Sequence, residues 1–240
     1  MVKFSTSLIC CDLSDIKSDL DVIASLPEEF HYLHADFMDG HFVPRYGISP
    51  ELVQWIKKRY GDLFTIDAHL MTDDPFTYAD VIAPYCDEYA FHIEAVKDPF
   101  RVIQKIDSFE GHHVPYIAHN LFTNVIETKK TLHALDRPFN VLFMGISPGV
   151  LGTDSCPTKV LMNMEKFASG DLLLANIIID GGVNFNSIGK YTYYHGDLKT
   201  LKLVCGNSTI FKQDEETRNM SRKDLIVHNA NRIRGCIRSK

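Results

Sequence analysis

One stretch decides the fold of this chain, and it reads His34-Ala35-Asp36-Phe37-Met38-Asp39-Gly40-His41-Phe42-Val43-Pro44. It places an imidazole and a carboxylate two residues apart, at the point where an apolar strand gives way to a glycine-containing turn. Residues i and i+2 of a strand share one face, so His34 and Asp36 point the same way and can bind one cation.

Two further apolar runs end in the same manner. Residues 66–71 place His69 near the end of one run, and residues 177–182 place Asp180 directly before two glycines. Two imidazoles and two carboxylates at the ends of apolar runs predict a mixed nitrogen and oxygen metal site. This ligand set suits zinc, ferrous iron, manganese or cobalt, and the sequence does not choose among them.

Eight apolar runs organise the chain, and they end near Ile9, Met38, Leu70, Glu94, Ala118, Met144, Asp180 and Gly206. Segments with helical periodicity lie between most of them, and the first such segment is expected to bury one helix face made of Leu13, Ile16, Leu20 and Ile23. Helix starts are marked by a capping residue before a proline, as in Ser49-Pro50, Asp74-Pro75 and Asp98-Pro99.

This alternation predicts a parallel sheet with helical crossovers. We expect an α/β fold in which the strands close into a (β/α)8 barrel, with an open doubly wound sheet as the alternative. The open sheet is disfavoured because no Gly-x-Gly-x-x-Gly follows the first strand and no P-loop is present. A length of 240 residues fits one barrel domain over residues 1–240.

The composition narrows the class of protein. A formal net charge of −6 argues against a nucleic-acid binder or a binder of anionic membranes. Six cysteines without a C-x-x-C pair indicate reduced thiols. No signal peptide and no apolar run of about 20 residues is visible, so we expect a soluble, cytoplasmic protein. The basic segment from Thr217 to Lys240 is expected to be a solvated helix face rather than a phosphate or partner site.

The string H-x-D-x-M-D-G-x-F-V-P resembles the ribulose-phosphate 3-epimerase family, which includes the allulose-6-phosphate 3-epimerases. Shorter matches extend from Ser5-Thr6-Ser7-Leu8 to Asn207-Ser208-Thr209-Ile210-Phe211. The resemblance implies a (β/α)8 barrel of the ribulose-phosphate-binding type. It also implies an isomerase that epimerises C3 of a ketose phosphate, from D-ribulose 5-phosphate to D-xylulose 5-phosphate, through a cis-enediolate. A small sugar phosphate is the implied partner, and a homo-oligomer stays open.

The resemblance assigns roles to individual residues. The implied metal ligands are His34, Asp36, His69 and Asp180, and Asp36 and Asp180 double as the acid and base that move the C3 proton. The implied substrate and phosphate site consists of Ser7, Gly149, Gly181, Gly182, Gly206 and Asn207. The implied pocket wall consists of Met38, Met71 and Met144, although methionine at such positions is also typical of core packing.

His92 and Glu94 match a pattern of the family's fourth strand, which leaves open whether they lie behind the metal ligands or face the substrate.

The chain departs from the family pattern near the expected pocket mouth. The loop after the sixth strand, usually P-G-F-G-G-Q, reads Pro148-Gly149-Val150-Leu151-Gly152-Thr153, which removes the glutamine. Arg45 stands where the family has asparagine, and residues 119–123 depart from L-N-P-x-T. A hexulose-phosphate 3-epimerase, such as an allulose-6-phosphate 3-epimerase, and a non-catalytic sugar-phosphate-binding paralogue are therefore the alternatives.

Two other enzyme classes are disfavoured. A phosphate-binding decarboxylase or synthase would usually place a catalytic lysine at a strand end, and no lysine stands beside the His and Asp positions. A metal-dependent amidohydrolase would carry an H-x-H pair in its first strand, which this sequence lacks.

Overall fold

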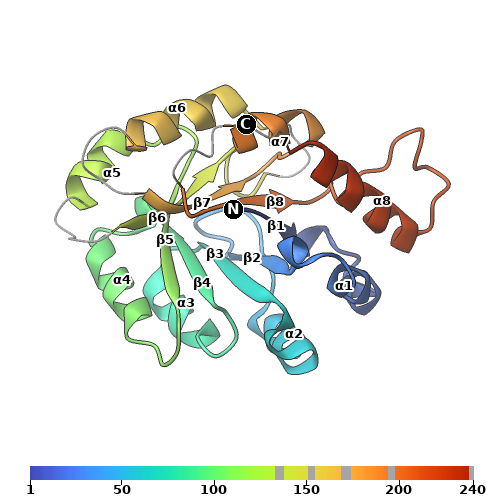
Figure 1. Cartoon of the computed structure of the whole chain (residues 1–240). Helices are drawn as coiled ribbons and strands as arrows, with labels where there is room; N and C mark the ends of the chain where they lie inside the picture. Colours follow the sequence, from blue (N-terminus) through green and yellow to red (C-terminus); the bar gives the residue numbers. More distant parts are fainter. Residues whose placement is uncertain (133–137, 151–154, 169–173, 194–197, 238–240) are drawn as a thin grey trace.

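The strands form a closed parallel barrel in the order β1 to β8, surrounded by helices (Figure 1). The computed structural model of the chain describes residues 1–132, 138–150, 155–168, 174–193 and 198–237. The strands are β1 (Val2–Ser7), β2 (Tyr32–Met38), β3 (Thr65–Met71), β4 (Glu88–His92), β5 (Val114–His119), β6 (Phe139–Met144), β7 (Leu174–Asp180) and β8 (Thr200–Cys205). The predicted (β/α)8 barrel is confirmed, and the open sheet is excluded because β1 pairs with β8.

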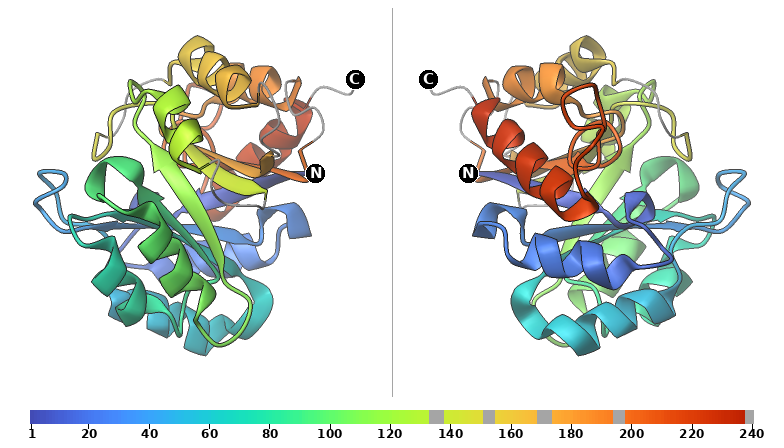
Figure 2. Two further views of the ribbon diagram at one scale, coloured as in Figure 1. Left: turned by 90° about the vertical axis from the view of Figure 1, so that its left-hand side faces the viewer. Right: turned by 90° about the vertical axis from the view of Figure 1, so that its right-hand side faces the viewer.

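Each strand leads into a helix that packs outside the barrel, as two further views show (Figure 2). The α-helices are α1 (Ile16–Ala24), α2 (Pro50–Tyr60), α3 (Pro75–Ile82), α4 (Pro99–Asp107), α5 (Val125–Leu132), α6 (Pro157–Ala168), α7 (Phe185–Tyr193) and α8 (Arg222–Gly235). Short 3-10 helices lie at η1 (Leu8–Cys10), η2 (Glu28–Phe30), η3 (Gly61–Leu63) and η4 (Ile93–Ala95).

The expected helix starts are confirmed at three positions. The side chains of Ser49, Asp74 and Asp98 accept backbone N–H groups in the first turns of α2, α3 and α4, and a proline follows each of them. These side chains satisfy N–H groups that have no partner within the helix.

The expected place of Leu13 is wrong. α1 begins at Ile16, and Leu13 is 57% exposed in the turn that precedes it. Asp12 accepts hydrogen bonds from the backbone N–H and the hydroxyl of Ser14. This local turn competes with the helix and moves Leu13 off the face that buries Ile16 and Ile23.

The core has two layers that follow from the alternation of side chains along the strands. Outward-facing residues such as Phe37 and Phe143 join helix residues such as Ile56 in the large cluster between barrel and helices. A smaller cluster fills the barrel interior with Ala90, Tyr116, Ala118, Leu142, Met144, Ile178 and Val204. The inward face of β7 changes from Ile178 to Asp180 at its carboxyl end. The inward faces of β2 and β3 are already polar further back, at His34 and Asp67.

Three of the five Lys and Arg residues that the structure describes after Thr217 pair with acids. Arg222 bonds to Asp19 of α1 at 2.7 Å, and α8 packs beside α1 (Figure 2). Arg232 lies 2.8 Å from Asp214, and Arg234 pairs with Glu29. This pattern fits the expected solvated helix face.

Two further features concern the cysteines and the helices. The six cysteines are free thiols. Within the described parts of the chain, no helix combines the length and the apolar character that a bilayer crossing requires.

Candidate metal centre

Strand register brings the four predicted ligands to one end of the barrel. In the pairing of β2 with β3, Asp36 stands beside His69 and His34 stands beside Asp67. Asp180 ends β7 on the other side of the barrel mouth. Because parallel strands present their carboxyl ends at the same edge, side chains distant in sequence meet there.

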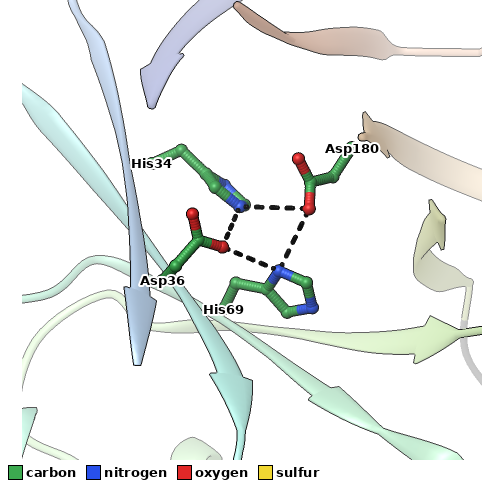
Figure 3. A group of neighbouring side chains, drawn as sticks. All are labelled: His34, Asp36, His69 and Asp180. Carbon is green, nitrogen blue, oxygen red and sulfur yellow. Dashed lines mark hydrogen bonds and ion pairs between the residues drawn. The ribbon is translucent and has the colours of Figure 1, made fainter. Parts of the chain in front are cut away.

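The four side chains point toward a common centre (Figure 3). One ligand atom from each of them lies within 4.8 Å of the others. Nε2 of His34 is 3.2 Å from Oδ1 of Asp36 and 3.7 Å from Oδ2 of Asp180. Nδ1 of His69 is 3.2 Å and 3.3 Å from the same two oxygens.

The donor set and its burial fit a divalent cation. His34 is fully buried, yet its Nε2 forms no hydrogen bond of acceptable geometry within the described structure. An unpartnered nitrogen in the interior is costly unless another group, such as an ion, interacts with it. Two imidazole nitrogens and two carboxylate oxygens around one point form a ligand set that suits first-row divalent metals.

The carboxylates and imidazoles of the centre shift one another's pKa. Burial alone would lower the pKa of His34, but the charges of Asp67, Asp36 and Asp180 raise it well above its ordinary value. Burial alone would also lower the pKa of His69, but hydrogen bonds to Asp180 and Asp36 raise it.

The acids of the centre shift in the opposite direction. Burial would raise the pKa of Asp36 and Asp180, yet the charge of His34 and close contacts with both histidines lower it. Both acids are therefore ionised near neutral pH, as metal ligation requires.

A buried charged network lies directly behind His34, and the sequence analysis missed it. Asp67 accepts hydrogen bonds from Nδ1 of His34 and from Ser5 at 2.7 Å, and it pairs with Lys202 at 3.3 Å. Lys202 also contacts Glu88. Burial alone would raise the pKa of Asp67, but the charges of Lys202 and His34 lower it to about 2. The signal was available, because Asp67 lies two residues before His69 on the same strand face.

His92 and Glu94 lie behind His69 and do not line the pocket. His92 is fully buried, with Nε2 2.9 Å from Nε2 of His69 and Nδ1 3.2 Å from Oε2 of Glu94. The first of the two open interpretations is therefore correct for both residues.

A pocket opens in front of the candidate metal centre. Its wall includes Asp36 and Asp180, all three predicted methionines, and every predicted substrate or phosphate residue, namely Ser7, Gly149, Gly181, Gly182, Gly206 and Asn207. The wall also includes residues to which no sequence pattern assigns a role, namely Cys10, Ile146, Val150, Val183, Val204 and Ser208. Met38 and Met71 pack with Val43 in a small apolar cluster beside the ligands.

Three of the four pocket glycines, Gly149, Gly181 and Gly182, adopt a backbone conformation that other residues rarely adopt. Gly181 has φ +94°, and an added Cβ would lie 2.5 Å from Cγ1 of Ile146. Gly149 has φ +73°, and its Cβ would lie 2.9 Å from Val43. These turns bring bare backbone to the pocket wall, where N–H groups can approach an anion.

Two of the three departures from the family pattern lie at the pocket or contact a residue that lines it. Arg45 donates a hydrogen bond to the carbonyl of Gly149 at 3.4 Å, which links the loop after β2 to the loop after β6. Val150 lines the pocket, whereas residues 151–154 of the altered loop lie outside the described residues.

Comparison with known proteins agrees with this geometry. The profile of the Ribulose-phosphate 3 epimerase family matches residues 3–198. The chain belongs to this family. It is therefore an isomerase, as the family's members are.

Family relatives cover almost the whole chain. The ribulose-phosphate 3-epimerase of Methanocaldococcus jannaschii is 26% identical over 219 residues, which are 90% of this chain and 88% of the relative. The Eremothecium gossypii protein of the same name is 27% identical and covers 100% of this chain and 97% of its own length. Among solved structures, Mycobacterium tuberculosis tryptophan synthase superposes with a TM-score of 0.58 at 12% identity, covering 100% of this chain and 93% of its own, which shows a shared fold alone.

Proposed function

We propose that this chain is a metal-dependent ketose-phosphate 3-epimerase that interconverts D-ribulose 5-phosphate and D-xylulose 5-phosphate. Family membership supports the reaction class, and the names of the relatives support the five-carbon substrate. The observation that carries the proposal is that Asp36 and Asp180 both contact His34 and His69 and both line the pocket.

The metal is held by His34, Asp36, His69 and Asp180 in this proposal. When bound, a divalent cation supplies positive charge that stabilises the oxygens of the enediolate.

The two carboxylates move the proton. One acid, in its ionised form, removes the C3 proton, which leaves a cis-enediolate. The other, which has taken up a proton from water before this step, delivers that proton to the opposite face of C3, and exchange of protons with water then restores both acids to their starting state. Asp36 extends from β2 and Asp180 from β7, so the two acids approach the pocket from different sides of the barrel. Each directs one oxygen toward the histidines, and the second oxygen of Asp36 lies 3.5 Å from the hydroxyl of Ser7. Which acid acts first depends on which epimer is bound.

The glycine turns position the substrate. Gly181, Gly182 and Gly206 follow β7 and β8, the two strands whose loops commonly form the phosphate site of such barrels. Met38, Met71 and Met144 present apolar side chains near the reacting carbon and restrict water there. Excluding water strengthens the charge interactions on which the proton transfers depend.

The test is turnover with metal-loaded and chelated protein. We expect D-ribulose 5-phosphate to yield D-xylulose 5-phosphate with the loaded protein, and we expect chelator to abolish the reaction. Zinc, ferrous iron, manganese and cobalt are added back separately to identify the active metals. A higher kcat/KM on D-allulose 6-phosphate would assign the hexulose substrate instead. Absence of turnover on either substrate by metal-loaded protein would favour a sugar-phosphate-binding paralogue.

A further inference from the structure

His69 and His92 meet edge to edge. Their Nε2 atoms are 2.9 Å apart, the ring centroids are 5.0 Å apart, and the ring planes differ by 25°. With nitrogen atoms this close, that centroid separation requires nearly coplanar rings that touch at their edges. This is the geometry of an in-plane hydrogen bond, in which one imidazole donates and the other accepts.

Glu94 fixes the direction of this hydrogen bond from the far side. Its Oε1 accepts the backbone N–H of Asn120 at 3.0 Å and the hydroxyl of Thr123, while Oε2 faces Nδ1 of His92. Burial alone would raise the pKa of Glu94, but the hydrogen bonds from His92, Thr123 and Asn120 lower it to about 2. An ionised carboxylate can only accept, so His92 must carry its proton on Nδ1.

The remaining proton positions follow. His92 is fully buried and lies one hydrogen bond from a metal ligand, so a second cation at this position is disfavoured. A neutral His92 protonated on Nδ1 has a lone pair on Nε2, which accepts a hydrogen bond from the Nε2–H of His69. A neutral His69 then has no proton on Nδ1, the nitrogen that faces Asp36 and Asp180.

The two histidine ligands therefore use opposite ring nitrogens. His34 turns Nε2 to the centre and is held at Nδ1 directly by Asp67. His69 turns Nδ1 to the centre, and its carboxylate partner lies one imidazole further away. Such outer hydrogen bonds commonly set the tautomer and the ring orientation of a metal-binding histidine.

We propose that His92 and Glu94 are positioning residues that fix the His69 tautomer, so that its Nδ1 lone pair faces the metal. This inference rests on the metal site of the proposed function. Phe42, from the loop after β2, packs against the His92 ring with centroids 4.8 Å apart. Its side chain covers the hydrogen-bonded relay formed by His69, His92 and Glu94, and so protects these hydrogen bonds from water.

The decisive variant is Glu94→Gln, which preserves shape and removes the charge. A glutamine amide can donate to His92 Nδ1, which moves the His92 proton to Nε2 and forces the His69 proton onto Nδ1, where it blocks the ligand position. We expect Co²⁺ affinity, measured by competition with a chromophoric chelator, to fall about 10- to 100-fold. The control is Glu110→Gln, the same chemical change on an exposed residue after α4, which should leave Co²⁺ affinity unchanged.

A second pair of variants separates the relay from packing. His92→Gln keeps an acceptor for His69 and should retain more Co²⁺ affinity than His92→Phe, which fills the space without one. The visible spectrum of bound Co²⁺ should change in His92→Phe and Glu94→Gln but not in Glu110→Gln.

Nitrogen NMR of the imidazoles in the Zn²⁺-loaded wild-type protein tests the proton positions directly. We expect His92 protonated on Nδ1 and His69 on Nε2. Protonation of His92 on Nε2, or wild-type Co²⁺ affinity in both Glu94→Gln and His92→Phe, would overturn the relay while leaving the proposed function intact. A wild-type protein that binds no divalent metal would overturn both.

Discussion

Nδ1 of His34, whose Nε2 faces the candidate metal centre, is hydrogen bonded to Asp67, a fully enclosed carboxylate that is also held by Lys202. This contact joins the candidate metal centre to the charged network inside the barrel. We therefore expect metal affinity and the stability of the fold to be coupled, so that a change in this network alters both.

Asp67→Asn tests this coupling. The amide keeps the shape of the side chain but removes the negative charge beside Lys202. Lys202 then keeps Glu88 as its acidic partner. We expect metal affinity to fall about 10- to 100-fold, and the free energy of unfolding of the metal-free protein to fall by about 3 kcal/mol. Urea unfolding measures the second effect.

Asp62→Asn is the control for that experiment. Asp62 pairs with Lys57 at 3.2 Å but its side chain is 98% exposed, so its loss should cost less than about 1 kcal/mol. Equal stability of the Asp67→Asn and Asp62→Asn proteins would contradict the coupling.

Asp180→Asn tests the two-carboxylate mechanism. Loss of one proton-transfer group should lower kcat by a factor of about 100 to 10,000. Metal content is measured on the same sample, because Asp180 is also a candidate ligand. Asp73→Asn, the same change on the exposed loop after β3, should keep wild-type kcat. Near-normal turnover by metal-loaded Asp180→Asn would show that the scheme is wrong.

Metal affinity should rise with pH. In the metal-free protein the pKa of His34 and of His69 is raised by the facing carboxylates, so protons compete with the ion at both ligand nitrogens. Below the raised pKa values an entering ion must displace these protons, and above them it displaces none. Dissociation constants measured between about pH 6 and pH 8 should therefore fall as pH increases, with proton release at the lower end. A pH-independent constant over this range is the contrary result.

Gly181→Ala tests the phosphate turn. The added Cβ meets Ile146 and forces alanine into a positive φ, so the turn must shift. We expect KM for the sugar phosphate to rise about tenfold, which corresponds to about 1.4 kcal/mol of binding free energy. Gly61→Ala is the matched control, because Gly61 also has a positive φ of +58° but no atom within 4 Å of an added Cβ. An unchanged KM in Gly181→Ala would remove this turn from the substrate site.

The sequence predicted those parts of the centre that depend on local pattern. His34 and Asp36 could be placed on one strand face without coordinates, because they are two residues apart. His69 and Asp180 could be placed near them, because a closed parallel barrel brings strand ends together. The glycine turns were predicted from the resemblance to the family's loops.

The parts that were missed or left open depend on contacts between distant strands. The pairing of Asp67 with Lys202 joins β3 to β8, and no local pattern specifies that contact. His92 could be placed only once its distance to His69 was known. Leu13 was wrongly placed because a turn at Asp12 outweighs helical spacing there.

The most direct test of the central claim is hydrogen exchange at C3 of D-ribulose 5-phosphate in deuterated water, followed by NMR. If His34, Asp36, His69 and Asp180 bind a divalent metal that supports proton transfer, loaded protein should incorporate deuterium at C3, chelation should stop the exchange, and returned metal should restore it. Metal-loaded protein that leaves C3 unlabelled, or chelated protein that exchanges it at the same rate, would contradict the account.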